Sequence, residues 1–179
     1  SRTSKRNGVS AKVKELANIT PFPAGLITVA VGGSVLETFL QNSPFYTGFH
    51  VMVLTPLVEM SNQVKLFYCH CIRSNRYKYS YGRQANTTLP DLTVPTIDNI
   101  PDYIKDFSIK DYGLCLLKQT NFPTTKILYD DNKETVKLSK LFVVENGLAS
   151  SQVLRKETKF SDNWVPYIRP SYRQETSID

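Results

Sequence analysis

The chain has 179 residues, of which 41% are hydrophobic and 11% aromatic, which suits one domain with a well-buried core. No run approaches the ~18 consecutive apolar residues of a membrane-spanning helix, and no apolar core follows the basic first residues as a secretory signal requires. We therefore expect no membrane partner, and three cysteines without disulfide spacing favour a reducing, cytoplasmic environment.

The net charge of +6 is unevenly distributed along the chain. Residues 1–20 hold five cations against Glu15 alone, residues 65–84 hold five cations and no acid, and acids collect between 91 and 111. Segregated positive charge favours a polyanionic partner, because neutralising phosphates releases counterions and drives binding. The alternative is a soluble protein whose surface charge is merely uneven.

The first half of the chain predicts extended segments. Residues 1–25 are polar and then proline-rich, with a short helical or extended piece at 11–17. Apolar, β-branched runs then predict strands at 26–31, which should be buried on both faces, at 35–40 after a Gly32-Gly33-Ser34 turn, and at 49–54 before Pro56.

The second half begins with a helical period. Apolar residues recur three or four apart between Met60 and Arg76, which predicts an amphipathic helix capped by Ser61 or Asn62. We expect a strand at 88–94 stopped by Pro95, a short helix at 101–105, a loop or linker at 130–137 and a new apolar segment at 141–144. The pattern favours an α/β or α+β fold with a twisted mixed sheet and a few helices.

Catalytic, metal and cofactor motifs do not stand out. Cys69-His70-Cys71 lacks the second ligand pair that a zinc site needs, and buried core cysteines are the better account. Gly32-Gly33-Ser34 fits no phosphate-loop pattern, and neither histidine lies in a recognisable nucleophile signature. We expect no cofactor, no metal and no enzymatic activity of the chain's own. A metal-dependent nuclease using Glu157, Lys159 and Asp130 or Asp131 is the enzymatic alternative.

The segment from Arg73 to Asn86 interleaves cations with tyrosines and amides. Cations hold phosphates, arginine reads guanine edges, and asparagine or glutamine reads adenine edges in the major groove of DNA. The candidate DNA-binding residues of this segment are Arg73, Arg76, Lys78, Tyr79, Tyr81, Arg83 and Gln84. The structural alternative is a helix end whose cations complement the helix dipole and whose tyrosines partly fill the core. For Tyr79 and Tyr81 the two interpretations stay equally open.

A short sequence motif, R-x-S-x-R, occurs near both ends of the chain. It reads Arg2-Thr3-Ser4-Lys5-Arg6 and Arg169-Pro170-Ser171-Tyr172-Arg173, with polar residues after each copy. A piece of a tandem-repeat protein that begins inside one repeat and ends inside the next would carry such a copy near each end. We therefore expect a fragment of a longer protein. The copies add the candidate DNA-binding residues Arg2, Lys5, Arg6, Asn7, Arg169 and Arg173.

Several short sequence stretches together resemble the target-recognition domain of restriction–modification specificity subunits. The related systems are the type I systems and the combined endonuclease–methyltransferase systems. The stretches occur in the family's order: 1–9, 25–33, 45–51, 79–95, and then 141–147 with 165–169. The last two resemble the start of a following recognition domain. No long heptad-like spacer helix follows Val94-Pro95, which favours a relative with shorter spacers.

The resemblance implies sequence-specific recognition of double-stranded DNA on behalf of partner methyltransferase and endonuclease subunits. It also implies a main recognition domain at 1–107, a connector at 108–140, and a segment at 141–179 that either starts a second repeat or completes the first. A protein-interaction module, with the tyrosine-rich stretch as its interface, is the non-enzymatic alternative.

Overall fold

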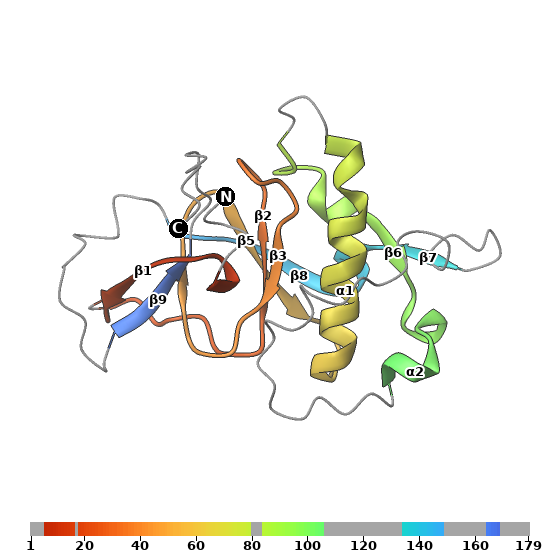
Figure 1. Cartoon of the computed structure of the whole chain (residues 1–179), viewed down its shortest axis with the longest axis horizontal. Helices are drawn as coiled ribbons and strands as arrows, with labels where there is room; N and C mark the ends of the chain where they lie inside the picture. Colours follow the sequence, from red (N-terminus) through yellow and green to blue (C-terminus); the bar gives the residue numbers. More distant parts are fainter. Residues whose placement is uncertain (1–5, 17, 80–83, 106–133, 149–163, 169–179) are drawn as a thin grey trace, which may run out of the picture.

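The computed structural model describes residues 6–16, 18–79, 84–105, 134–148 and 164–168. The strands in this part of the chain are β1 (Val9–Lys14), β2 (Ile27–Ala30), β3 (Thr38–Leu40), β4 (Tyr46–Thr47), β5 (Val51–Pro56), β6 (Thr93–Pro95), β7 (Thr135–Lys137), β8 (Phe142–Asn146) and β9 (Trp164–Ile168). The α-helices are α1 (Asn62–Ser74) and α2 (Asp102–Lys105). Short 3₁₀ helices include η2 (Arg6–Gly8), η3 (Asn75–Tyr79), η4 (Leu89–Asp91), η5 (Ile97–Asn99) and η7 (Leu138–Lys140). The architecture is α+β (Figure 1).

An antiparallel sheet in the order β3-β2-β5-β8 forms the centre of the molecule. Its side chains alternate between two apolar layers, since successive residues of a strand point to opposite faces. Met52 and Leu54 of β5 belong to the main core, whereas Val51 and Val53 belong to a second cluster. This explains why the strand expected at 26–31 is buried along all of β2.

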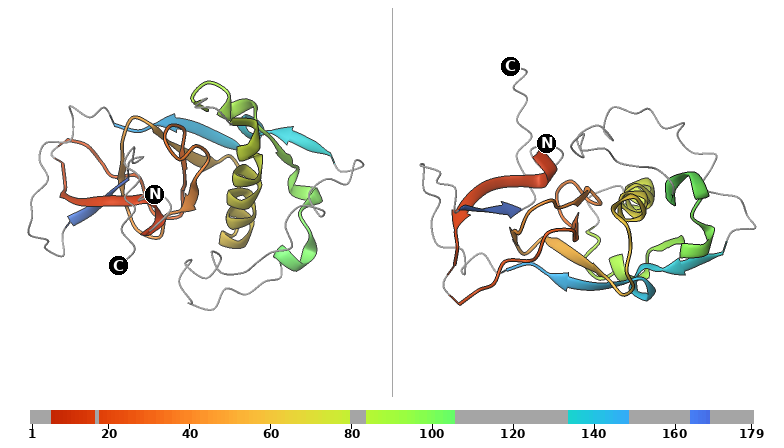
Figure 2. Two further views of the ribbon diagram at one scale, coloured as in Figure 1. Left: turned by 45° about the horizontal axis from the view of Figure 1, so that its top comes forward. Right: turned by 90° about the horizontal axis from the view of Figure 1, so that it is seen from below.

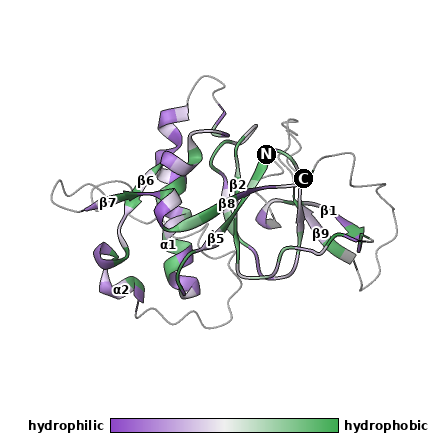
Figure 3. Ribbon diagram, turned by 180° about the vertical axis from the view of Figure 1, so that it is seen from behind, coloured by the Kyte–Doolittle hydropathy of each residue, from purple (hydrophilic) through white to green (hydrophobic). Residues whose placement is uncertain are grey.

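Helix α1 covers the face of the sheet that carries the main core (Figure 1). Ser61 caps its N-terminus, where the side-chain oxygen accepts a hydrogen bond from the Val64 N–H. Its buried face presents Tyr68 and Ile72 to the sheet, and the Tyr68 ring meets Phe142 of β8 edge-on at 5.5 Å. Hydrophobic residues gather on the central strands, and polar ones colour much of α2 (Figure 3).

A three-stranded sheet in the order β1-β9-β4 lies on the other side of the central sheet (Figure 2). Strand β9 pairs antiparallel with β1 and parallel with β4. Ile168 of β9 packs with Phe45, Val51 and Val53, so this sheet closes the second apolar layer. Strands β8 and β9 are therefore integral to sheets that begin in the first 56 residues.

Three expected boundaries are corrected by the structure. The strand expected from residue 35 starts at Thr38, because the turn continues through Leu36, which has a φ of 60° and donates its N–H to the Ala30 carbonyl. The strand expected at 88–94 begins as η4, with Pro90 in its first turn, and only Thr93–Pro95 is extended. The loop expected at 130–137 contains β7, which pairs with β6.

Other expectations are confirmed. The helix predicted between 60 and 76 is present, with Ser61 as its cap. The piece at 11–17 is extended, as most of it lies in β1, and a short helix follows Pro101. In the described part of the chain, no helix is long and apolar enough to cross a membrane.

Candidate nucleic-acid interface

The C-terminal end of α1 leads directly into the cation-rich segment. Asn75 ends the helix: its backbone N–H bonds to the carbonyls of Arg73 and Ile72, and its buried side-chain amide donates to the Cys71 carbonyl at 2.9 Å. The chain then tightens into η3, which carries Arg76, Tyr77 and Lys78 on the surface. The helix end is therefore firmly held where the candidate DNA-binding residues begin.

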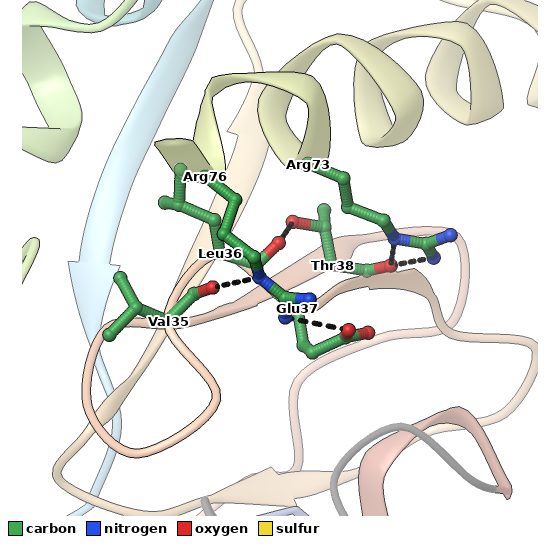
Figure 4. Close-up of polar contacts among 6 residues, drawn as sticks. All are labelled: Val35, Leu36, Glu37, Thr38, Arg73 and Arg76. Atoms are coloured by element: carbon green, nitrogen blue, oxygen red, sulfur yellow. Dashed lines mark hydrogen bonds and ion pairs between the residues drawn. The ribbon is translucent and has the colours of Figure 1, made fainter. Parts of the chain in front are cut away.

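Arg73 ties α1 to the strand β3. Its Nε donates to the Thr38 carbonyl at 3.0 Å, and its Nη2 donates to the same oxygen (Figure 4). The guanidinium carbon also lies 5.2 Å from the centre of the Phe39 ring, within the range of a cation–π contact. The partly buried Arg73 side chain therefore supports the fold at this position.

Arg76 is held by the turn that precedes β3. Its Nε donates to the Val35 carbonyl at 2.9 Å, and its Nη2 forms an ion pair with Glu37 Oε1 at 2.7 Å (Figure 4). Half of the Arg76 side chain is exposed, but only 13% of the Glu37 side chain. Arg76 therefore combines internal contacts with access to a partner.

The N-terminal basic segment reaches the same strand from another side. In η2, Asn7 has a φ of 53° and Gly8 a φ of 77°, a left-handed geometry that asparagine and glycine adopt most readily. The Asn7 carbonyl accepts a hydrogen bond of 3.0 Å from Gln41 Nε2, which also donates to Thr28 Oγ1. A Cβ atom on Gly8 would lie 3.4 Å from the Phe39 ring.

Phe39 thus lies between the two basic segments, with Gly8 on one side and Arg73 on another. Charge clustering predicts both segments as DNA-binding candidates, and among their described residues Gly8 and Arg73 both lie against Phe39 of β3. Sequence reasoning missed Phe39, Thr38 and Glu37. One signal was available for Glu37, since it is the only acid between Glu15 and Glu59.

The remaining described candidates differ in exposure. Lys78 is exposed, and its Nζ lies 5.8 Å from the centre of the Tyr77 ring, whose side chain is 63% exposed. Tyr79 packs against the main core, and its hydroxyl is 3.0 Å from Thr88 Oγ1. Gln84 is exposed, and its amide oxygen accepts a hydrogen bond from Asn86. Lys78 and Gln84 are exposed, whereas Tyr79 is partly buried against the edge of the main core.

Several predicted residues lie outside the described part of the chain. Among the candidate DNA-binding residues these are Arg2, Lys5, Tyr81, Arg83, Arg169 and Arg173, and among the nuclease candidates Asp130, Asp131, Glu157 and Lys159. For Arg6 the backbone of η2 is described.

Cys69 and Cys71 are buried in α1. Burial raises the pKa of each thiol to about 12, so both stay protonated at neutral pH and are poor nucleophiles and metal ligands. Among the residues that the structure describes, no group of three His, Cys, Asp or Glu side chains is placed to hold a metal ion.

Comparisons of the chain with protein-family models, with curated proteins and with solved structures found no match.

Proposed function

We propose that this chain recognises a specific sequence in double-stranded DNA as the specificity component of a restriction–modification system. Partner methyltransferase and endonuclease subunits would act on the chosen site, and the chain itself would perform no chemistry. The observation that supports this proposal best is that Gly8, which follows the first basic segment, and Arg73, which begins the second, both lie against Phe39.

The residues of the segment from Arg73 to Asn86 suit different tasks in DNA binding. Lys78 lies on an exposed 3₁₀ turn beside the exposed Tyr77, and an ammonium in that position can neutralise a phosphate. Gln84 carries an exposed amide, the group that recognises adenine edges. Arg73, whose guanidinium is occupied by Thr38 and Phe39, would instead hold α1 in place.

The first test measures binding of labelled duplexes to the chain over a range of salt concentrations. Duplexes come from a random-sequence pool before and after selection for binding. We expect enrichment of a short motif and an affinity that falls steeply with salt, because phosphate contacts release counterions. Absence of binding at low salt would contradict the proposal, and salt-insensitive binding to another protein would favour the interaction module.

The Lys78→Ala variant tests the assignment of a phosphate contact. It should weaken binding to selected and random duplexes alike, and reduce the slope of log K against log salt by about 0.9. Lys105→Ala is the matched control, because Lys105 lies on α2 in an exposed ion pair with Asp102. Equal affinities and slopes for both variants would remove Lys78 from the interface.

A DNA-cleavage assay with magnesium or manganese tests the enzymatic alternative, a metal-dependent nuclease. Cleavage that is lost in Glu157→Ala would favour a nuclease. DNA binding without cleavage is the result that the proposal requires.

A further inference from the structure

The guanidinium of Arg76 is held along one side only. Its Nε–H bonds to the Val35 carbonyl and its Nη2 to Glu37 Oε1, both on the turn that leads into β3 (Figure 4). Nη1 makes no hydrogen bond with the residues that the structure describes, and half of the side chain is exposed. The remaining donors form a planar fork, whose orientation is set by these two contacts, at the end of a half-exposed side chain.

The backbone beneath Arg76 is equally well held. Asn75 is buried, and it bonds through its main chain and side chain to the last turn of α1. Arg73 fixes that turn to Thr38 of β3, next to Glu37, the turn residue that pairs with Arg76. The fork is therefore supported at its base and along one edge, as recognition of a defined hydrogen-bonding partner requires.

The charge of Glu37 restricts what that partner can be. Its carboxylate lies 2.7 Å from Arg76 Nη2 and is only 13% exposed, so the pair is close to neutral as a unit. A phosphate on the fork would bring a second anion close to this carboxylate, and like charges at such separations repel. The guanine edge carries no net charge, and its O6 and N7 accept two parallel hydrogen bonds from an arginine fork.

We propose that Arg76 reads a guanine in the major groove of the target and that Glu37 is its positioning residue. This inference rests on the proposed function, and assigns to one of its residues the role of base recognition rather than phosphate binding. Arg76 and Lys78 would then have different roles, since the exposed ammonium of Lys78 suits a phosphate and the guanidinium fork of Arg76, held by Val35 and Glu37, suits a base.

The experiment compares the wild-type chain with Arg76→Lys, Arg76→Ala and Glu37→Gln in selections from the same random duplex pool. Affinities for the selected duplex, for its variants substituted at each guanine, and for random duplex are then measured at two salt concentrations. Circular dichroism and thermal unfolding of each variant identify any loss of fold. Arg76→Lys keeps the charge and loses the fork, so it separates base recognition from phosphate binding.

We expect the wild-type motif to contain a guanine whose preference disappears in both Arg76 variants. Affinity for the selected duplex should fall about ten- to hundredfold in both variants, while Arg76→Lys, which keeps the positive charge beside Glu37, should leave affinity for random duplex and the salt slope unchanged. Glu37→Gln should weaken the preference at the same guanine without weakening binding to random duplex. In an Arg76→Ala background, Glu37→Gln should have no further effect on that preference.

Three results would overturn the inference. In the first, Arg76→Lys keeps the guanine preference and the wild-type affinity for the selected duplex, as a phosphate contact predicts. In the second, Glu37→Gln changes the guanine preference equally with and without Arg76. In the third, the wild-type chain binds DNA with no guanine preference. Absence of wild-type binding would instead contradict the proposed function, and the inference with it.

Discussion

Two arginines, one helical turn apart, show how residues of one type acquire different roles. The Nε and Nη2 groups of Arg73 both donate to the Thr38 carbonyl, and the Phe39 ring packs against the guanidinium. The positive charge of Arg73 is therefore engaged by contacts within the molecule. Arg76 is held along one edge and is half exposed. The neighbours on β3, rather than the sequence around each arginine, make this difference.

The role of Arg73 predicts a measurable loss of stability. Arg73→Ala removes charge-assisted hydrogen bonds and leaves the Thr38 carbonyl without its partner, which should cost about 2 kcal/mol of unfolding free energy. Urea unfolding followed by circular dichroism measures the change. Lys105→Ala removes an exposed ion pair and should stay within about 0.5 kcal/mol of the parent chain. Equal midpoints for the two variants would show that the contact with Thr38 carries no stability.

At the scale of the element, α1 connects core and interface. Its apolar period places Tyr68 and Ile72 in the core, and its last turn delivers Arg73 and η3 to β3. A helix that ended earlier would leave the cation-rich segment without this attachment. The stability of α1 therefore bears directly on the geometry of the candidate interface.

The N-terminal cap of α1 offers a test at this scale. Ser61→Ala removes the acceptor for the Val64 N–H and should lower the unfolding free energy by about 0.5–1 kcal/mol, the lower part of the range for caps because the bond measures 3.4 Å. Ser74→Ala, at the other end of α1, is the control. Its hydroxyl bonds back to the His70 carbonyl, a contact that does not favour helices, so we expect almost no change. Equal losses at both positions would contradict the assignment of Ser61 as the cap.

At the scale of the whole molecule, segments from both halves of the chain meet where β4 ends. Gly48 donates its N–H to the Ile168 carbonyl, Leu148 donates to the Thr47 carbonyl, and Gly147 donates to the Val51 carbonyl. Strands β4, β5, β8 and β9 are thus joined at one point by backbone hydrogen bonds. Close backbone approach at this point requires residues without side chains.

Gly147 is the position most sensitive to a side chain. A Cβ there would lie 2.8 Å from the Thr47 carbonyl oxygen and closer still to that of Gly48, so the two backbones would have to separate. We expect Gly147→Ala to destabilise the fold by about 3 kcal/mol or more, as measured by thermal and urea unfolding. Gly32→Ala is the matched control, since its Cβ would only touch His50 at 3.4 Å. A Gly147→Ala variant as stable as Gly32→Ala would contradict the close packing described at this junction.

The sequence by itself determined the features that depend only on residues close together in the chain. The apolar period of α1, its Ser61 cap and the β-branched run of β2 predict those elements, because periodicity and capping are local properties. Boundaries near Leu36 and Pro90 were wrong, since a left-handed turn and a 3₁₀ helix replaced the expected extended chain. The alternation of segments left α/β and α+β open, and the antiparallel pairing of the central sheet decides for α+β.

Only the tertiary structure decided how the basic segments relate to each other and to β3. Composition identifies Arg73 and Arg76 as cations, but their partners Thr38, Val35 and Glu37 lie more than thirty residues away in the chain. Phe39 carries no sequence signal that marks it as the residue between Gly8 and Arg73. Such contacts depend on strand register and on the packing of α1 over the sheet, which no local pattern encodes.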